Sequence, residues 1–164
     1  MSEVDGRGVG GGYPVVLVGA GRMLAVVVGG GQVGSRKVEG LLAAGIRVRL
    51  VSPSAGERLA ALADGRVIVW ERRAYRAGDL DGASLAFAAT SQRQANRDVA
   101  DDARAAGILC NVADAPGEGS FIVPAVHRSA GIVLAVSTGG ASPSRAAAVR
   151  DRLAAVLDGP DARP

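Results

Sequence analysis

Residues 17–37 read LVGAGRMLAVVVGGGQVGSRK, and this stretch holds two clusters of glycine separated by an apolar run. The second cluster fits the G-x-G-x-x-G pattern of dinucleotide-binding loops, with Gly29, Gly31 and Gly34 at the three glycine positions. The run before it, MLAVVVG at 23–29, is typical of a parallel strand buried on both faces. Apolar residues at helical spacing follow it, so the second cluster joins a strand to a helix, as a phosphate-binding loop does.

The first glycine cluster lacks this context. Gly19 and Gly21 are followed by Leu24 where a third glycine would stand, and the next element is a strand rather than a helix. No helix N-terminus would therefore point at a phosphate from this place. We interpret residues 19–22 as a β-turn that follows a short strand, YPVVLV at 13–18.

The second cluster is therefore expected to bind the pyrophosphate of NAD, and the alternative is a glycine turn with a purely structural role. The expected cofactor contacts come from the loop and the first helical turn: Gly29, Gly30, Gly31, Gln32, Val33 and Gly34. The acidic residue that holds the adenosine ribose of NAD is expected about twenty positions further on. That position carries Ser52, whose hydroxyl can bond the ribose without repelling a 2′-phosphate, so the sequence leaves NAD and NADP both open.

Strand-like and helix-like segments alternate along most of the chain. Strands are predicted at 46–52, 66–71, 84–90 and 108–112, and helices after the loop and at 54–63 and 92–106. This alternation with short connections predicts an α/β protein with a Rossmann-type, doubly wound parallel sheet.

The pattern changes near residue 119. Two strands at 120–126 and 131–138 have no helix between them and are expected to pair as a hairpin, with Pro124 weakening the first. A helix at 142–157 follows, with Ser142 as its N-cap and Pro143 at its first position. We therefore divide the chain into a flexible leader at 1–12, an NAD-binding domain at 13–118 and an extension at 119–164.

Composition excludes several classes of protein. The apolar runs are too short to span a membrane, and the N-terminus has no apolar segment of the kind found in signal peptides. The single cysteine, Cys110, excludes an internal disulfide framework and favours the cytoplasm. The net charge of +3 comes from a composition in which Lys37 is the only lysine, and the few aromatic residues are scattered, so nucleic-acid binding is not expected.

Several motifs follow one another in order: GGGQVGSRK at 29–37, LAFAAT with Asn96 shortly after, CNVADAP at 110–116, SFIVPA at 120–125 and VSTGGASP at 136–143. With this combination the chain resembles the precorrin-2 dehydrogenase/sirohydrochlorin ferrochelatase family, the N-terminal module of siroheme synthase. The resemblance covers residues 13–157. It implies NAD-dependent oxidation of precorrin-2 to sirohydrochlorin, with insertion of ferrous iron in bifunctional members, and a homodimer formed through the extension.

The resemblance also implies site residues. The acidic residue of the CNVxDAP motif is the family's main catalytic group, and here it is Asp114. Thr138 stands where some members have a serine. Longer members continue into a helical region that helps to cover the tetrapyrrole. This chain stops at Pro164 after its first such helix, which leaves open whether its active site is complete or is finished by another chain.

The residues themselves allow two interpretations of Asp114. It follows a predicted parallel strand, on the edge where α/β folds bind ligands, and its carboxylate can accept the proton lost as hydride leaves the substrate. The alternative is a local role in the turn before Pro116. Thr90 ends the preceding strand, where a cofactor passes, and Asn111 is expected to orient the loop or the cofactor.

The remaining polar residues give weaker signals. Arg128, Arg145 and Arg150 are candidates for binding substrate carboxylates, although solvated arginines are the simpler interpretation. His127 is the only histidine, so one chain cannot hold a cluster of histidine ligands, and no metal site is predicted. The leading hypothesis is thus a precorrin-2 dehydrogenase. The alternative is a non-catalytic sensor or partner subunit that binds NAD or a tetrapyrrole.

Overall fold

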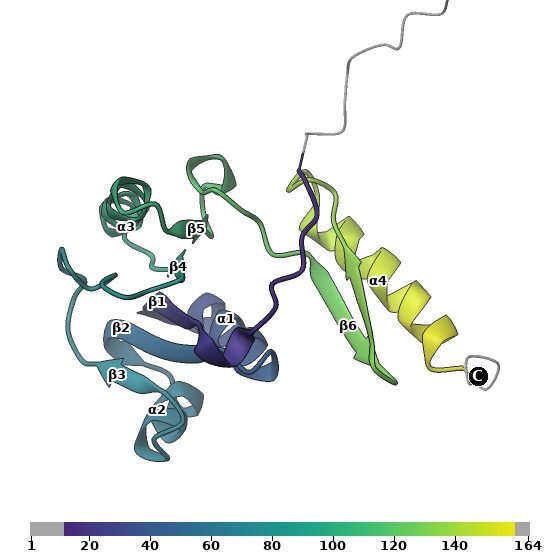
Figure 1. Cartoon of the computed structure of the whole chain (residues 1–164), viewed down its shortest axis with the longest axis horizontal. Helices are drawn as coiled ribbons and strands as arrows, with labels where there is room; N and C mark the ends of the chain where they lie inside the picture. The colour runs from purple at the N-terminus through teal and green to yellow at the C-terminus, as the bar shows by residue number, and fades with distance from the viewer. Residues whose placement is uncertain (1–11, 160–164) are drawn as a thin grey trace, which may run out of the picture. The chain divides into compact units, whose positions relative to one another are not determined.

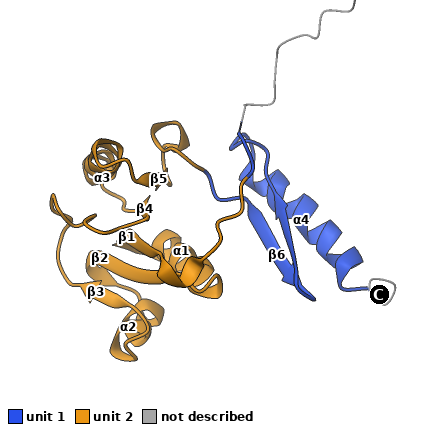
Figure 2. Cartoon of the chain, in the orientation of Figure 1, with its two compact units in different colours: residues 1–14, 122–164 blue, residues 15–121 orange. Residues whose placement is uncertain are grey.

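The computed structural model describes residues 12–159 (Figure 1). The predicted leader at 1–12 lies outside this range except for its last residue. The chain divides into two compact units, one of residues 15–121 and one of residues 122–164 with residues 1–14 (Figure 2). Among the described residues, no helix is long and apolar enough to cross a membrane.

The larger unit is built on one sheet of five parallel strands in the order β3-β2-β1-β4-β5. The strands are β1 (Leu24–Gly30), β2 (Arg47–Ala55), β3 (Val69–Glu71), β4 (Leu85–Ala88) and β5 (Leu109–Val112). The chain runs outward from β1 to β3 and then returns to β4 on the other side of β1, which confirms the predicted doubly wound fold. Ligands of such sheets bind at the carboxyl ends of the strands where this reversal occurs, here between β1 and β4.

Both faces of the sheet are buried because the central strands are apolar throughout. Val27 of β1 and Phe87 of β4 face the core shared with α1 (Gln32–Ala43) and α2 (Glu57–Asp64). Val26 and Ala86 face the opposite core, shared with α3 (Arg93–Ala105). Alternate residues of each strand point to opposite faces, so continuous apolar runs are what a sheet between two helical layers requires.

The end of α1 is stabilised by a glycine. Gly45, which follows the C-cap residue Ala44, has a φ of +76°. Its N–H donates to the carbonyl of Leu42 at 2.9 Å, and the N–H of Ile46 donates to that of Leu41 at 3.0 Å. This Schellman pattern satisfies the last carbonyls of the helix and turns the chain into β2.

The predicted strand at 13–18 is wrong. These residues form no strand, and the apolar side chains of Tyr13, Val16 and Val18 are at least 80% exposed. The first regular element is a single 3-10 turn, η1 (Ala20–Arg22), which begins after Gly19 in the left-handed conformation. A run of apolar and β-branched residues such as YPVVLV suits a strand, but it cannot show that a neighbouring strand is present to pair with it.

The smaller unit contains the predicted hairpin and helix. Strands β6 (Ala125–Ser129) and β7 (Ile132–Val136) pair antiparallel. The first strand begins only after Pro124, later than predicted, since proline has no N–H to give to a ladder. In α4 (Pro143–Leu157), the Ser142 hydroxyl accepts the N–H of Arg145 at 3.3 Å, which confirms the predicted N-cap.

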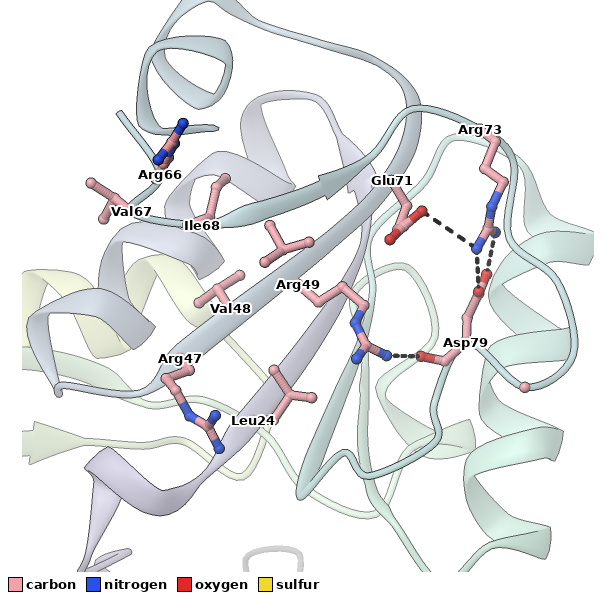
Figure 3. Close-up of a pocket in the computed structure, with 12 residues that line it drawn as sticks. Leu24, Arg47, Val48, Arg49, Arg66, Val67, Ile68, Glu71, Arg73 and Asp79 are labelled. Carbon is pink, nitrogen blue, oxygen red and sulfur yellow. Dashed lines mark hydrogen bonds and ion pairs between the residues drawn. The ribbon is translucent and has the colours of Figure 1, made fainter. Parts of the chain in front are cut away.

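The connection from β3 to β4, residues 72–84, contains no helix. Beside it lies a hollow of about 520 Å³ along the starts of β1, β2 and β3 (Figure 3). Its polar side chains largely bond one another: Arg73 donates two hydrogen bonds to Asp79, and Arg49 donates to the Asp79 carbonyl oxygen. The hollow is at the amino ends of the strands, so it is separate from the glycine loop at the carboxyl end of β1.

Asp79 accepts hydrogen bonds from Arg73 and Arg49 and so holds this connection in place. Its contribution to the free energy of unfolding is expected to depend on pH. Its side chain is buried, and the Arg73 guanidinium, at 2.7 and 2.8 Å, holds the pKa of the Asp79 carboxyl below its usual range. A carboxyl with a lowered folded-state pKa stabilises the fold above its unfolded-state pKa and loses that contribution as pH falls through the folded-state value. We expect Asp79→Asn to lower the free energy of unfolding at pH 7 by about 2 kcal/mol, and by much less at about pH 3.

Urea denaturation at the two pH values measures this difference. Asp81→Asn is the matched control, because Asp81 is exposed and lies two residues further along the same connection. An equal loss of stability at both pH values would show that the charge of Asp79 is not what matters.

Candidate functional site

The glycine loop lies between the carboxyl end of β1 and the start of α1, as the motif predicts. Gly29 has a φ of +117°, and a Cβ there would collide with the Ala89 carbonyl group and lie 2.9 Å from the Thr90 nitrogen. A Cβ at Gly34 would collide with the carbonyl oxygen of Gly29. The first and third glycines of the motif are therefore required by the packing of the chain itself.

Gly31, the second glycine of the motif, is different. A Cβ at this position would have no atom of the described chain within 4 Å, and the backbone φ of −80° suits any residue. Neither packing nor conformation explains a glycine here. The space beside it fits a dinucleotide phosphate that must approach the backbone closely.

The start of α1 completes a phosphate cradle. Gly31 is the N-cap, and no side chain caps the helix. The N–H groups of the first turn, from Gln32 onward, have no partner within the helix and carry its positive dipole end. The residues present therefore fit the pyrophosphate of a dinucleotide, with Gly30, Gln32 and Val33 at the predicted positions.

Ser52 supports the glycine loop by bonding the backbone of Gly30. Its hydroxyl accepts the N–H of Gly30 at 3.0 Å and donates its single hydrogen to the carbonyl of Ser54 at 2.7 Å, and the residue is 6% exposed. This arrangement differs from the predicted role, in which the hydroxyl would face the ribose. β2 continues to Ala55, so its carboxyl end lies three residues beyond the predicted ribose position.

The neighbouring strand reinforces this contact. Trp70 of β3 donates its indole N–H to the carbonyl of Ser52 at 2.9 Å. The guanidinium of Arg72 lies over the Trp70 ring, 4.4 Å from its centroid. A chain of contacts thus runs from β3 through Ser52 to the glycine loop.

A second group of polar residues gathers at the carboxyl ends of β4 and β5. Its centre is Asn96 on α3, which is fully buried. The Asn96 amide nitrogen donates to the Thr90 carbonyl at 3.0 Å and to Asp114 Oδ1 at 2.9 Å. The Asn96 amide oxygen accepts the Thr90 N–H at 3.0 Å and lies 2.8 Å from the Thr90 hydroxyl. The structure therefore brings together Thr90 and Asp114, two of the predicted site residues.

The other oxygen of Asp114 faces a cation. Arg93 Nη1 lies 3.6 Å from Asp114 Oδ2, and Arg93 Nη2 pairs with Glu118, which raises the pKa of the guanidinium. The Asp114 side chain is 39% exposed. It bonds Asn96, and the turn η2 (Pro116–Glu118), whose N-cap residue is Ala115, has no side-chain cap.

Asn111 contacts the segment that follows β5. It is buried on β5, and its amide nitrogen donates to the Phe121 carbonyl at 3.0 Å, while its amide oxygen has no partner among the described residues. The Phe121 ring meets that of Phe87 edge-on at 5.5 Å, and the amine of Lys37 lies 5.9 Å from the Phe87 centroid. Burial and the neighbouring Arg36 lower the pKa of Lys37.

Thr138 belongs to the smaller unit. Its hydroxyl donates to the Ser142 carbonyl at 3.0 Å and accepts the Ser142 N–H at 3.0 Å, so it shapes the turn before α4. His127 Nε2 lies 3.1 Å from Asp158 Oδ2. Arg150 pairs with Asp151.

Sequence reasoning missed three features of the site: the ion pairs of Arg93 with Asp114 and Glu118, the central place of Asn96, and the half-buried Lys37. The arginine and the asparagine lie in a polar helix, where nothing in the spacing distinguishes a buried contact from a solvated one.

Among the described residues, no three His, Cys, Asp or Glu side chains gather to hold a metal ion.

Known proteins resemble the chain in sequence and in fold. Residues 18–125 match a family described as "Putative NAD(P)-binding". Siroheme synthase 1 of Aeromonas salmonicida is 40% identical over 132 residues, and siroheme synthase of Nitrosomonas europaea is 41% identical over 133. Each alignment covers 80% of this chain and 28% of the relative, so the chain spans little more than a quarter of these proteins.

A solved structure, "SirC, precorrin-2 dehydrogenase", superposes with a TM-score of 0.76 at 24% identity. The match covers 89% of this chain and 72% of that one. At this level of identity the likeness shows a shared fold. The sequence matches, rather than this structure, confirm the predicted resemblance to siroheme synthases over the matched segment.

Proposed function

The chain belongs to the NAD(P)-binding family whose sequence model matches residues 18–125, and on that premise we propose that it oxidises precorrin-2 to sirohydrochlorin with NAD as hydride acceptor. One observation carries the proposal: a half-exposed carboxylate, Asp114, is held at the carboxyl end of the sheet that also carries the open glycine loop. Acid–base groups beside a nucleotide loop are what hydride transfer from a protonated carbon requires.

The relatives support the choice of substrate. Siroheme synthases share about 40% of their residues with the chain over the matched segment, and a protein named precorrin-2 dehydrogenase shares its fold. The motifs GGGQVGSRK, CNVADAP and VSTGGASP contain the glycine loop, Asp114 and the turn before α4.

The proposed chemistry assigns a separate task to each group. A bound NAD would supply the acceptor for the hydride that the macrocycle loses. The Asp114 carboxylate accepts the proton that the substrate loses with that hydride, so that NADH, sirohydrochlorin and one proton are the products. The N–H groups at the start of α1 hold the pyrophosphate, and Ser52 keeps the loop in shape. Arg93 keeps a positive charge beside Asp114.

We also propose that the smaller unit forms a homodimer. Its hairpin and helix leave large apolar side chains exposed: Ile132 at 50%, Val133 at 56%, Leu153 at 44% and Val156 at 70%. Surfaces of this kind mark protein–protein contacts. A second copy of the chain would bring a second set of the residues around Thr138 to the assembly.

The proposal is tested by incubating the purified chain with NAD and freshly prepared precorrin-2 without oxygen. We expect NADH and sirohydrochlorin to form in equal amounts, and a parallel reaction with NADP shows which of the two cofactors the chain prefers. A chain that binds NAD and a tetrapyrrole but makes no NADH would instead be a sensor or partner subunit.

A further inference from the structure

We propose that Asn96 is a positioning residue. It holds the carboxylate of Asp114 at a fixed position relative to the turn at Thr90, and the glycine loop packs against that turn. The proposal rests on the proposed function, in which Asp114 accepts the proton. Asn96 itself touches neither reactant. It would act through Asp114, by keeping that carboxylate at one place beside the bound dinucleotide.

The amide of Asn96 can adopt only one orientation. Its two hydrogens go to the Thr90 carbonyl and to Asp114, and its oxygen accepts the Thr90 N–H. Rotating the amide by half a turn would place the NH₂ group against an N–H and the oxygen against a carboxylate. Both contacts would be repulsive, and the residue is fully buried, so water cannot relieve them.

The same amide connects the acid to the cofactor loop. Thr90 accepts and donates hydrogen bonds with Asn96, and its backbone nitrogen would lie 2.9 Å from a Cβ at Gly29. The preceding residue, Ala89, donates its N–H to the Val28 carbonyl at 2.8 Å. β1, the loop and the turn after β4 therefore form one set of direct contacts, and Asn96 extends this set to Asp114.

Packing alone does not explain an asparagine at this position. Asn96 lies in the first turn of α3, and the other buried residues of that helix, Val99, Ala100 and Ala103, are apolar. Burying an amide is costly unless all its groups are bonded. Bonding the Thr90 backbone uses one amide hydrogen and the oxygen, and the second amide hydrogen is satisfied by half-exposed Asp114.

The charged groups around Asp114 influence its ionisation, so a test by substitution must take them into account. Arg93 of α3 lies beside its second oxygen, and Glu118 of η2 reaches it only through Arg93. A carboxylate in place of the Asn96 amide would stand within hydrogen-bond distance of Asp114. Two carboxyl groups so close cannot both ionise easily, and one of them then retains its proton to higher pH.

The test compares Asn96→Asp and Asn96→Ala with Gln94→Ala. Gln94 is the control because its amide, in the same helix, bonds only exposed Asp98. In both Asn96 variants we expect kcat to fall by about tenfold to a hundredfold. The acid limb of the pH–rate profile should move to higher pH in both variants, and further in Asn96→Asp, which adds a carboxyl group, than in Asn96→Ala, which only removes a hydrogen-bond donor. Loss of rate with the profile unchanged would overturn the proposal, since a structural defect lowers activity without moving an ionisation.

A double-mutant cycle covers the case in which Asn96→Asp does not fold. If Asn96 acts through Asp114, Asn96→Ala should cost little further activity in an Asp114→Ala background, so the two effects are not additive. Additive effects would overturn the proposal.

A measurement without substrate separates this proposal from the proposed function. The ¹³C resonance of the Asp114 carboxyl should titrate at higher pH in Asn96→Asp than in the wild type. If it does while the wild type fails to oxidise precorrin-2, the positioning contact is supported and the choice of substrate is wrong. If the titration is unchanged, the positioning role itself is wrong.

Discussion

Gly31→Ala is expected to abolish dinucleotide binding while leaving the folded chain intact. A Cβ at Gly31 meets no atom of the described protein within 4 Å, and the backbone there is suited to alanine. The added methyl group would enter the space that the pyrophosphate must occupy beside the first turn of α1. We expect the dissociation constant for NAD to rise at least about a hundredfold, a loss of about 2.7 kcal/mol, in isothermal titration calorimetry.

The other two glycines of the motif supply the matched comparison. At Gly29 and Gly34 the same methyl group would collide with backbone atoms, so those alanine variants should lose stability as well as binding. The thermal midpoint of Gly31→Ala should stay close to that of the wild type. NAD binding that survives in Gly31→Ala would show that the dinucleotide does not approach this loop.

Asp114→Ala is expected to reduce turnover of precorrin-2 by about 10²- to 10⁴-fold, the range found when a general acid or base is removed. NAD binding should be almost unaffected, because Asp114 makes no contact with the glycine loop among its hydrogen bonds and ion pairs. Initial rates of NADH formation give kcat, and calorimetry gives the affinity for NAD.

Asp114→Asn is the sharper variant. Its amide oxygen can still accept the hydrogen bond from Asn96, so the local structure is kept while the ability to take a proton is lost. Both variants should be equally slow if proton transfer is the role of Asp114. Turnover retained in Asp114→Asn but lost in Asp114→Ala would assign the residue a purely structural part.

The doubly wound sheet could be predicted because its signals are local. The buried run before Gly29, the helical spacing after Gly34 and the glycine at position 45 each act within a few residues. The segment at 13–18 has an equally good strand pattern but no partner strand, and pairing depends on distant residues that the pattern does not contain. Pro124 was correctly expected to weaken a strand, but the start of β6 depended on the ladder with β7.

The site was harder to predict than the fold. Thr90 and Asp114 lie in the predicted region because the carboxyl ends of parallel strands share one edge of the sheet. The direction of the Ser52 hydroxyl depends on two backbone groups, the N–H of Gly30 and the carbonyl of Ser54, and no sequence spacing encodes their approach. The contact of Asn96 with Asp114 joins residues eighteen positions apart, and only the fold shows that they meet.

Trp70 gives the protein a fluorophore in a useful place. It is the only tryptophan in the chain, and its indole is bonded to the backbone of Ser52, the residue that holds the glycine loop. Indole emits light in the band that reduced nicotinamide absorbs, whereas oxidised nicotinamide does not absorb there. Quenching of tryptophan emission by energy transfer therefore distinguishes the two redox forms of a bound cofactor, so a stopped-flow fluorimeter can time reduction within a single turnover of unlabelled protein.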